Sequence, residues 1–112
     1  MLRKGAVIAV LAVLVACAFP GLAKNDEAYI AAANRAIEFV VQFATDRIEA
    51  ADSYAEMVFW ANWADAHVAW ILAWLERKIG PVEYEVYEVT VYNEKVGRSI
   101  TFDPIHVIGG GG

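Results

Sequence analysis

Apolar residues recur at every third or fourth position from residue 26 to residue 79. The series starts at Ile30 and continues through Ala33, Ile37 and Val40 towards Leu75. This spacing places the apolar side chains on one face of an α-helix. Residues 26–79 also contain no Gly or Pro. The pattern fits either one continuous helix, about 80 Å long at 1.5 Å per residue, or two helices that turn back on each other.

The local signals favour two antiparallel helices, Asp26 to about Ala50 and Tyr54 to Ile79. Ser53 and Glu56 are spaced as in a capping box, the arrangement that starts many helices. The second helix ends at Gly80-Pro81, because Gly tolerates the left-handed conformation after a helix and Pro cannot continue one.

The remaining chain is dense in Val, Ile, Thr, Tyr and Phe, which indicates strands over about residues 82–92 and 98–108. The alternation of apolar and polar residues slips at Val86-Tyr87, which suggests a bulge or a strand buried on both faces. The segment 93–97 ends in Gly and has the composition of a hairpin loop. Pro104 cannot donate to a strand ladder and marks an irregular point.

These elements predict an α+β fold, in which a helical hairpin is followed by a β-hairpin that packs on the second helix. One domain over residues 24–108 accounts for the chain. The glycines at 109–112 have no side chains to pack and predict a flexible tail.

The second predicted helix carries all four tryptophans. They share one helical stripe with a histidine, at spacings of 3, 4, 3 and 4: Trp60, Trp63, His67, Trp70 and Trp74. A separate stripe that includes Val58, Val68 and Leu72 is also apolar. Helices that are apolar nearly all round are buried.

Three interpretations of the tryptophan stripe stay open. It can be core, it can be a surface for self-association, or it can stack on a sugar, a lipid or a planar ligand with His67 as the polar group. Self-association is favoured by the small size of the chain, which leaves little material to cover a helix on every side. A membrane span is disfavoured, because Asp65 falls in the centre of the segment.

The first 23 residues have the layout of a secretory signal: Arg3 and Lys4, an apolar run from Ala6 to Ala16, then small residues before Lys24. Cleavage after Ala23 is the preferred interpretation. The alternative is lipidation at Cys17, because residues 14–17 resemble a lipobox. The protein is therefore expected to be exported to the periplasm or the outside of the cell, either free or anchored to a membrane through Cys17 or an uncleaved signal.

Charge and cysteine content exclude two classes of protein. The chain carries a net charge of -5, and loss of Arg3 and Lys4 would leave seven basic and 14 acidic residues, or -7. Such an acidic protein is a poor ligand for nucleic acid, which needs Lys and Arg to neutralise phosphates. A single cysteine cannot form an internal disulfide scaffold.

No catalytic or metal-binding constellation stands out, and no cofactor is predicted. Ser53 is better explained as a helix cap than as a nucleophile. Asp103 and His106 could meet near Pro104, which is the basis of a weaker hydrolase or isomerase hypothesis. The glutamates at 83, 85 and 88 are typical of a charged face that protects an edge strand.

The sequence thus predicts a small exported protein without enzymatic activity that self-associates or binds a protein partner. Its contacts would be the aromatic helix and a strand edge. The alternative hypothesis is a periplasmic binding module that holds an apolar or aromatic ligand in a cavity between the Trp/His stripe and the hairpin, with Tyr84 and Tyr87 on the far wall.

Overall fold

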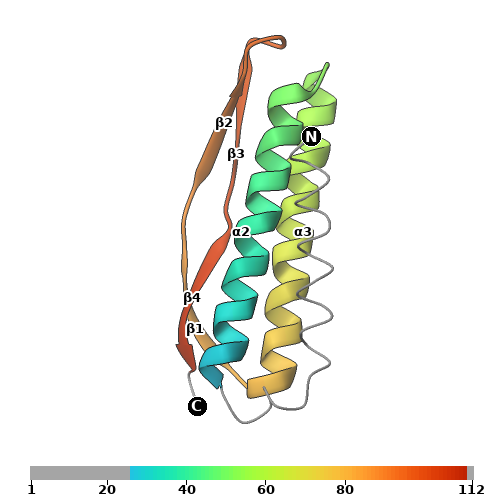
Figure 1. Ribbon diagram of the computed structural model, residues 1–112. Coiled ribbons are helices and arrows are strands. Elements are labelled where there is room, and N and C mark those ends of the chain that lie inside the picture. The colour runs from blue at the N-terminus through green and yellow to red at the C-terminus, as the bar shows by residue number, and fades with distance from the viewer. Residues whose placement is uncertain (1–25, 111–112) are drawn as a thin grey trace.

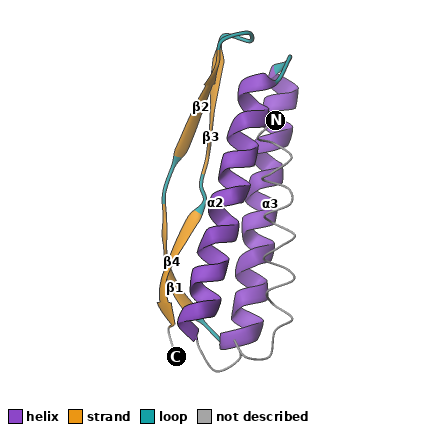
Figure 2. Cartoon of the chain, in the orientation of Figure 1, coloured by secondary structure: helices purple, strands orange, loops and turns teal. Residues whose placement is uncertain are grey.

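The structure is a computed structural model and describes residues 26–110. The predicted signal at 1–23, the lipidation candidate Cys17 and residues 111–112 lie outside the described residues. Two antiparallel helices, α2 (Asp26–Ala50) and α3 (Tyr54–Ile79), form one layer. A long β-hairpin runs along one side of them and forms the second layer (Figure 1, Figure 2). The predicted α+β fold is confirmed.

The corner between the helices lies where the capping signal predicted it. The chain leaves helical conformation at Ala51, and Ser53 caps α3 by accepting a hydrogen bond from the backbone N–H of Glu56 at 3.2 Å. Glu56 completes the cap by accepting from the backbone N–H of Asp52 at 3.0 Å. The two-helix interpretation is therefore confirmed, and no Gly or Pro is needed at the turn because side chains satisfy the free backbone groups.

The far end of α3 stops at Gly80, as predicted. Gly80 has a φ of 87°, and its N–H donates to the carbonyl of Glu76 at 2.9 Å. Arg77 and Lys78 in the last turn complement the negative end of the helix dipole.

Four strands make up the hairpin: β1 (Val82–Val86), β2 (Val89–Asn93), β3 (Arg98–Phe102) and β4 (Ile105–Gly110). β1 pairs with β4, and β2 pairs with β3, both antiparallel. The chain leaves strand conformation between the two pairs at residues 87–88 and 103–104, and the N–H of Tyr87 donates to the carbonyl of Pro104 at 3.0 Å. The slip at Val86-Tyr87 is therefore the end of β1 and not a bulge, and the register shift within the β1–β4 ladder lies between Glu83 and Tyr84. Gly97 has a φ of 74° and closes the loop onto Asn93.

One expectation about the hairpin is wrong and another is incomplete. The glycine tail does not begin at residue 109, since the backbones of Gly109 and Gly110 in β4 pair with Glu83 and Val82 in β1. A ladder needs only backbone groups, so missing side chains do not prevent pairing. The hairpin also packs on both helices, because β2 and β4 contact α2 while β3 contacts α3.

The core lies between the helices and beneath the hairpin. Small residues bring the two helices close together, and larger aliphatic side chains fill the space below the strands. The buried alanines include Ala33, Ala36, Ala44, Ala61 and Ala64, and the hairpin contributes Val91, Phe102, Ile105 and Val107. Burial of this apolar area is the main stabilising contribution to the fold.

Asn93 fastens the tip of the hairpin to the helical corner. It is fully buried, and its Nδ2 donates to the carbonyls of Ile48 at 2.7 Å and Ala51 at 2.8 Å. Its Oδ1 accepts from the N–H of Val96 at 2.8 Å. The last carbonyls of a helix lack donors within the helix, so the amide of Asn93 provides hydrogen-bond donors at the end of α2.

Asn34 fastens the other end of the hairpin. Its amide makes a two-way contact with the backbone of Val107 in β4: Nδ2 donates to the carbonyl at 2.9 Å, and Oδ1 accepts from the N–H at 2.8 Å. The side chain therefore makes the same pair of hydrogen bonds with Val107 as the backbone of a neighbouring strand would make. Together, Asn34 and Asn93 fix which side of the helix pair the hairpin covers.

Candidate interaction surface

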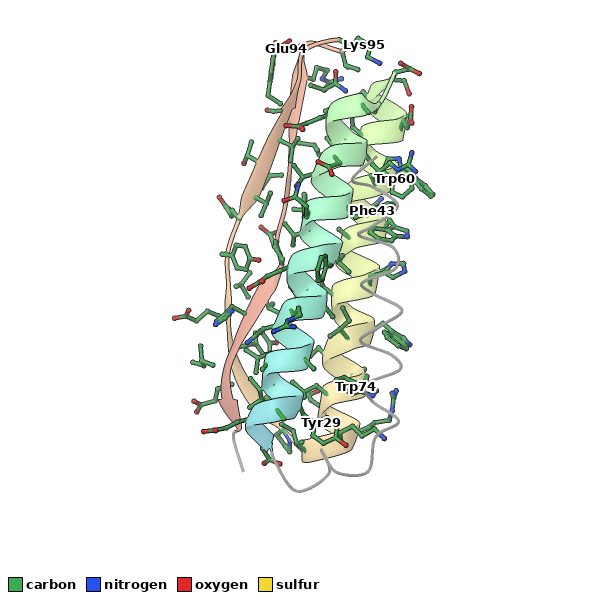
Figure 3. The ribbon with its side chains drawn as sticks, in the orientation of Figure 1. Tyr29, Phe43, Trp60, Trp74, Glu94 and Lys95 are labelled. Carbon is green, nitrogen blue, oxygen red and sulfur yellow. The ribbon has the colours of Figure 1, made fainter. Side chains whose placement is uncertain are left out.

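The tryptophan stripe lies on the side of the helices that faces away from the hairpin. Figure 3 shows Trp60 and Phe43 there, from α3 and α2, with the strands on the opposite side of the helix pair. Asp65 marks the other side of α3, since it accepts a hydrogen bond from the backbone of Asp103 between β3 and β4. The described part of the chain therefore has two unlike sides, one covered by the hairpin and one aromatic.

The structure divides the predicted stripe into three environments. Trp74 is buried, and its ring lies 5.7 Å from that of Tyr29 on α2. Trp60, Trp63 and His67 are half-buried. Trp70 is 46% exposed. The stripe is thus core at one end and surface towards its middle, so neither the core interpretation nor the surface interpretation holds for all five residues.

Phe43 of α2 anchors the half-buried part of the stripe. Its ring centroid lies 5.7 Å from that of Trp60 and 5.1 Å from that of Trp63. The guanidinium of Arg47 stacks over Phe43 at 5.2 Å and over Trp60 at 5.3 Å. Edge-on and tilted ring contacts at these distances are favourable, so this cluster is preorganised rather than loosely packed.

The imidazole of His67 contacts another residue of the same helix. Its ring lies 4.1 Å from that of Trp63, and its Nδ1 is 2.9 Å from the carbonyl of Trp63. A carbonyl oxygen can only accept, so Nδ1 carries the hydrogen and donates. This contact fixes the tautomer and the orientation of the imidazole.

An exposed seam runs along α3 beside the stripe. It consists of Glu56, Phe59, Trp63, Ala66, Trp70, Ala73 and Arg77, at alternating spacings of 3 and 4. Phe59 is 57% exposed, and the two alanines are exposed. Between the terminal Glu56 and Arg77 the seam has no polar side chain. Phe59 is outside the predicted stripe, although it precedes Trp63 by four residues, about one helical turn.

The hairpin does not form a wall opposite the stripe. Tyr87 lies between β1 and β2, and burial, followed by the charge of Glu38 on α2, raises the pKa of its hydroxyl. Tyr84 is exposed on β1. The described residues therefore do not form the cavity between stripe and hairpin that the ligand hypothesis requires.

The remaining chemical candidates are not brought together. No hydrogen bond or ion pair joins the side chains of Asp103 and His106 in the described residues. Within residues 26–110, no three His, Cys, Asp or Glu side chains gather where they could hold a metal ion. Ser53 acts as the helix cap, and Glu83 and Glu85 lie exposed on β1.

Burial raises the pKa of Asp65, and the nearby Asp103 carboxylate raises it further, against the opposing effect of the hydrogen bond from the backbone of Asp103. This is the one carboxylate within the apolar part of α3, and it lies under the β3–β4 break. The aromatic side of α3 is therefore left without acidic residues between Glu56 and Glu76.

Neither α2 nor α3 is long and apolar enough to cross a membrane. Comparison of the chain with protein-family models, with curated proteins and with solved structures finds no match. The surface itself is therefore the basis for a functional proposal.

Proposed function

We propose that the protein is a small exported interaction or assembly protein, and that its working surface is the aromatic side of α3. The observation that carries the proposal is the exposed seam from Phe59 to Ala73, on the helix side that the hairpin leaves uncovered. Export rests on the N-terminal sequence alone, with its basic start and apolar run.

Exposed apolar surface is costly in water, and contiguous apolar patches on a folded chain mark contact sites. Aromatic residues are enriched in such contacts, because they bury a large area with few rotatable bonds. Here the exposed ring of Phe59 packs on Trp60, which in turn packs on Phe43 of α2. The surface therefore needs little reorganisation before it binds.

The edge of the β-hairpin is a weaker second contact for self-association. In the described residues, β1 pairs only with β4, which leaves its other edge available. Pairing of β1 with β1 of a second copy would bring the acidic residues Glu83 and Glu85 of both copies close together. Like charges on adjacent strands are destabilising, so the helix side is the favoured surface.

The test compares two double variants of the full chain. One replaces Phe59 and Trp70 with Gln, and the matched control replaces Tyr84 and Tyr92, which are 44% and 58% exposed on the hairpin, with Gln. Molar mass by light scattering reports assembly, and circular dichroism reports helicity.

We expect the helix-side variant to lose assembly while its helicity stays unchanged, and the hairpin variant to match the parent chain. Loss of helicity in the helix-side variant would show that these rings are core. Equal assembly in all three proteins would show that the contact lies elsewhere. Either result overturns the proposal.

A further inference from the structure

We infer that the occupant of the aromatic side is a second copy of this chain, and that the two α3 helices pair antiparallel about a two-fold axis near Ala66. This inference rests on the proposed function, because it names the partner of the same surface. It follows from the order of residues along the seam, from the charges at its ends and from its area.

The charges at the ends of the seam set the direction of pairing. Glu56 stands at the start and Arg77 at the end, with uncharged residues between them. A parallel pair would set Glu56 against Glu56 and Arg77 against Arg77. An antiparallel pair sets each Glu56 against the second copy's Arg77, and it also opposes the two helix dipoles.

The order of residues along the seam gives two kinds of pair under the same symmetry. With the axis near Ala66, Phe59 lies level with the second copy's Ala73, and a large residue facing a small one fills space without overpacking. Trp63 lies level with the second copy's Trp70, which brings two aromatic rings together. Ala66 at the axis lets the two helices approach closely.

The area of the seam fits a small dimer interface. α3 has 26 residues and is about 39 Å long at 1.5 Å per residue, and a helix is about 10 Å wide. The product is about 400 Å² per copy, which is in the range of small, reversible interfaces.

Cysteine cross-linking tests the geometry in the full chain with Cys17 replaced by Ser. Ala66→Cys lies at the proposed axis, while Ala55→Cys and Ala73→Cys lie away from it. A disulfide requires Cα atoms about 4.4–6.8 Å apart. We expect cross-linked dimers from Ala66→Cys and none from the other two variants. Cross-linking at all three positions would show a parallel pair and overturn the inference.

Charge exchange tests the same geometry without cysteine. Arg77→Glu places two glutamates together at each end of an antiparallel dimer and leaves the Glu56 cap intact, so we expect dimerisation to weaken about tenfold. Glu56→Arg combined with Arg77→Glu should restore it. Glu76→Arg is the matched control, since Glu76 lies beside Arg77 but off the seam, and it should change the dissociation constant less than about twofold.

The outcomes separate this inference from the proposed function. If the Phe59/Trp70 variant abolishes assembly but Ala66→Cys does not cross-link and charge exchange has no effect, the surface stands and the antiparallel pair is wrong. If the parent chain is monomeric and its aromatic side is protected only while residues 1–25 are attached, the chain's own N-terminal segment is the occupant and the second copy is excluded.

Discussion

The two sides of the α2–α3 pair differ in what covers their apolar surface. On one side the hairpin covers the helices, and two buried or half-buried asparagines, Asn34 and Asn93, hold it in register through backbone groups. On the other side rings from both helices pack against one another, and Phe59 and Trp70 stay exposed. One hairpin covers only one side of a helix pair, so within residues 26–110 the aromatic side stays uncovered, and this is the basis of the proposal that another molecule binds there.

The largest expected difference in stability is between two variants of the tryptophan stripe. Trp74→Ala should lower the free energy of unfolding by about 3–5 kcal/mol, because it empties a buried site beside Tyr29. Trp70→Ala, one turn away, should lower the stability of the monomer by no more than about half as much, because nearly half of this residue is exposed. Chemical denaturation at protein concentrations below the dissociation constant measures both. Equal losses would show that Trp70 is core and would remove the contrast.

The hairpin side should be most sensitive at Asn93. Asn93→Ala removes three hydrogen bonds and leaves the carbonyls of Ile48 and Ala51 without that donor. We expect a loss of about 3 kcal/mol in denaturation experiments. Asn62→Ala is the matched control on the exposed surface of α3, with an expected change within about 0.5 kcal/mol. A small effect at Asn93 would mean that the tip is not held by this side chain.

Asp65, on the hairpin side of α3, should make the free energy of unfolding depend on pH. The sign should be opposite to that of a carboxylate in an ordinary ion pair. The pKa of Asp65 is raised from 3.8 on folding by burial, so the folded state holds the proton more tightly than the unfolded state. The contribution of Asp65 to stability is therefore most favourable below pH 3.8 and is lost as the pH rises through the folded pKa.

Asp65→Asn should remove this loss and raise stability at pH 7 by about 0.5 kcal/mol, a small value because the carboxyl keeps much of its contact with water. The asparagine carbonyl can still accept the hydrogen bond from the backbone of Asp103. Denaturation at pH 3 and pH 7 measures the effect. A variant less stable than the parent at pH 7 would contradict the assignment.

The smallest effect is expected at the tip of the hairpin, where Lys95 pairs with Asp52 at 2.7 Å. The hydrogen bond and the charge of Lys95 lower the pKa of Asp52 from 3.8. The contribution of the pair to stability is therefore present above pH 3.8 and is lost as the pH falls through the folded pKa. Lys95→Met should flatten the acid limb of the stability curve and leave its neutral region nearly unchanged.

The sequence predicted the elements better than it predicted their arrangement. Helix bounds follow from local signals, since Ser53, Glu56 and Gly80 each act on neighbouring backbone groups. The breaks at Tyr87 and Pro104 were likewise visible in alternation and in backbone chemistry. The strand formed by Gly109 and Gly110 was not predicted, because pairing with Val82 and Glu83 depends on backbone groups distant in sequence.

The candidate surface was predicted in part. Spacing alone placed Trp60, Trp63, His67, Trp70 and Trp74 on one stripe of α3. It could not show that Tyr29 buries Trp74 or that Phe43 half-buries Trp60 and Trp63, because these contacts come from α2. The roles of Asn34 and Asn93 were also missed, since an asparagine that bonds a distant backbone has no local signature.

Native mass spectrometry of the chain produced with its own N-terminus and recovered from the cell envelope tests the central claim most directly. One spectrum reports the first residue, the number of protein chains and any retained small molecule. We predict a complex of two chains that start at Lys24 with nothing else bound. A single chain without a protein partner, bare or carrying a small ligand, would contradict the claim that the aromatic side of α3 is a surface for assembly.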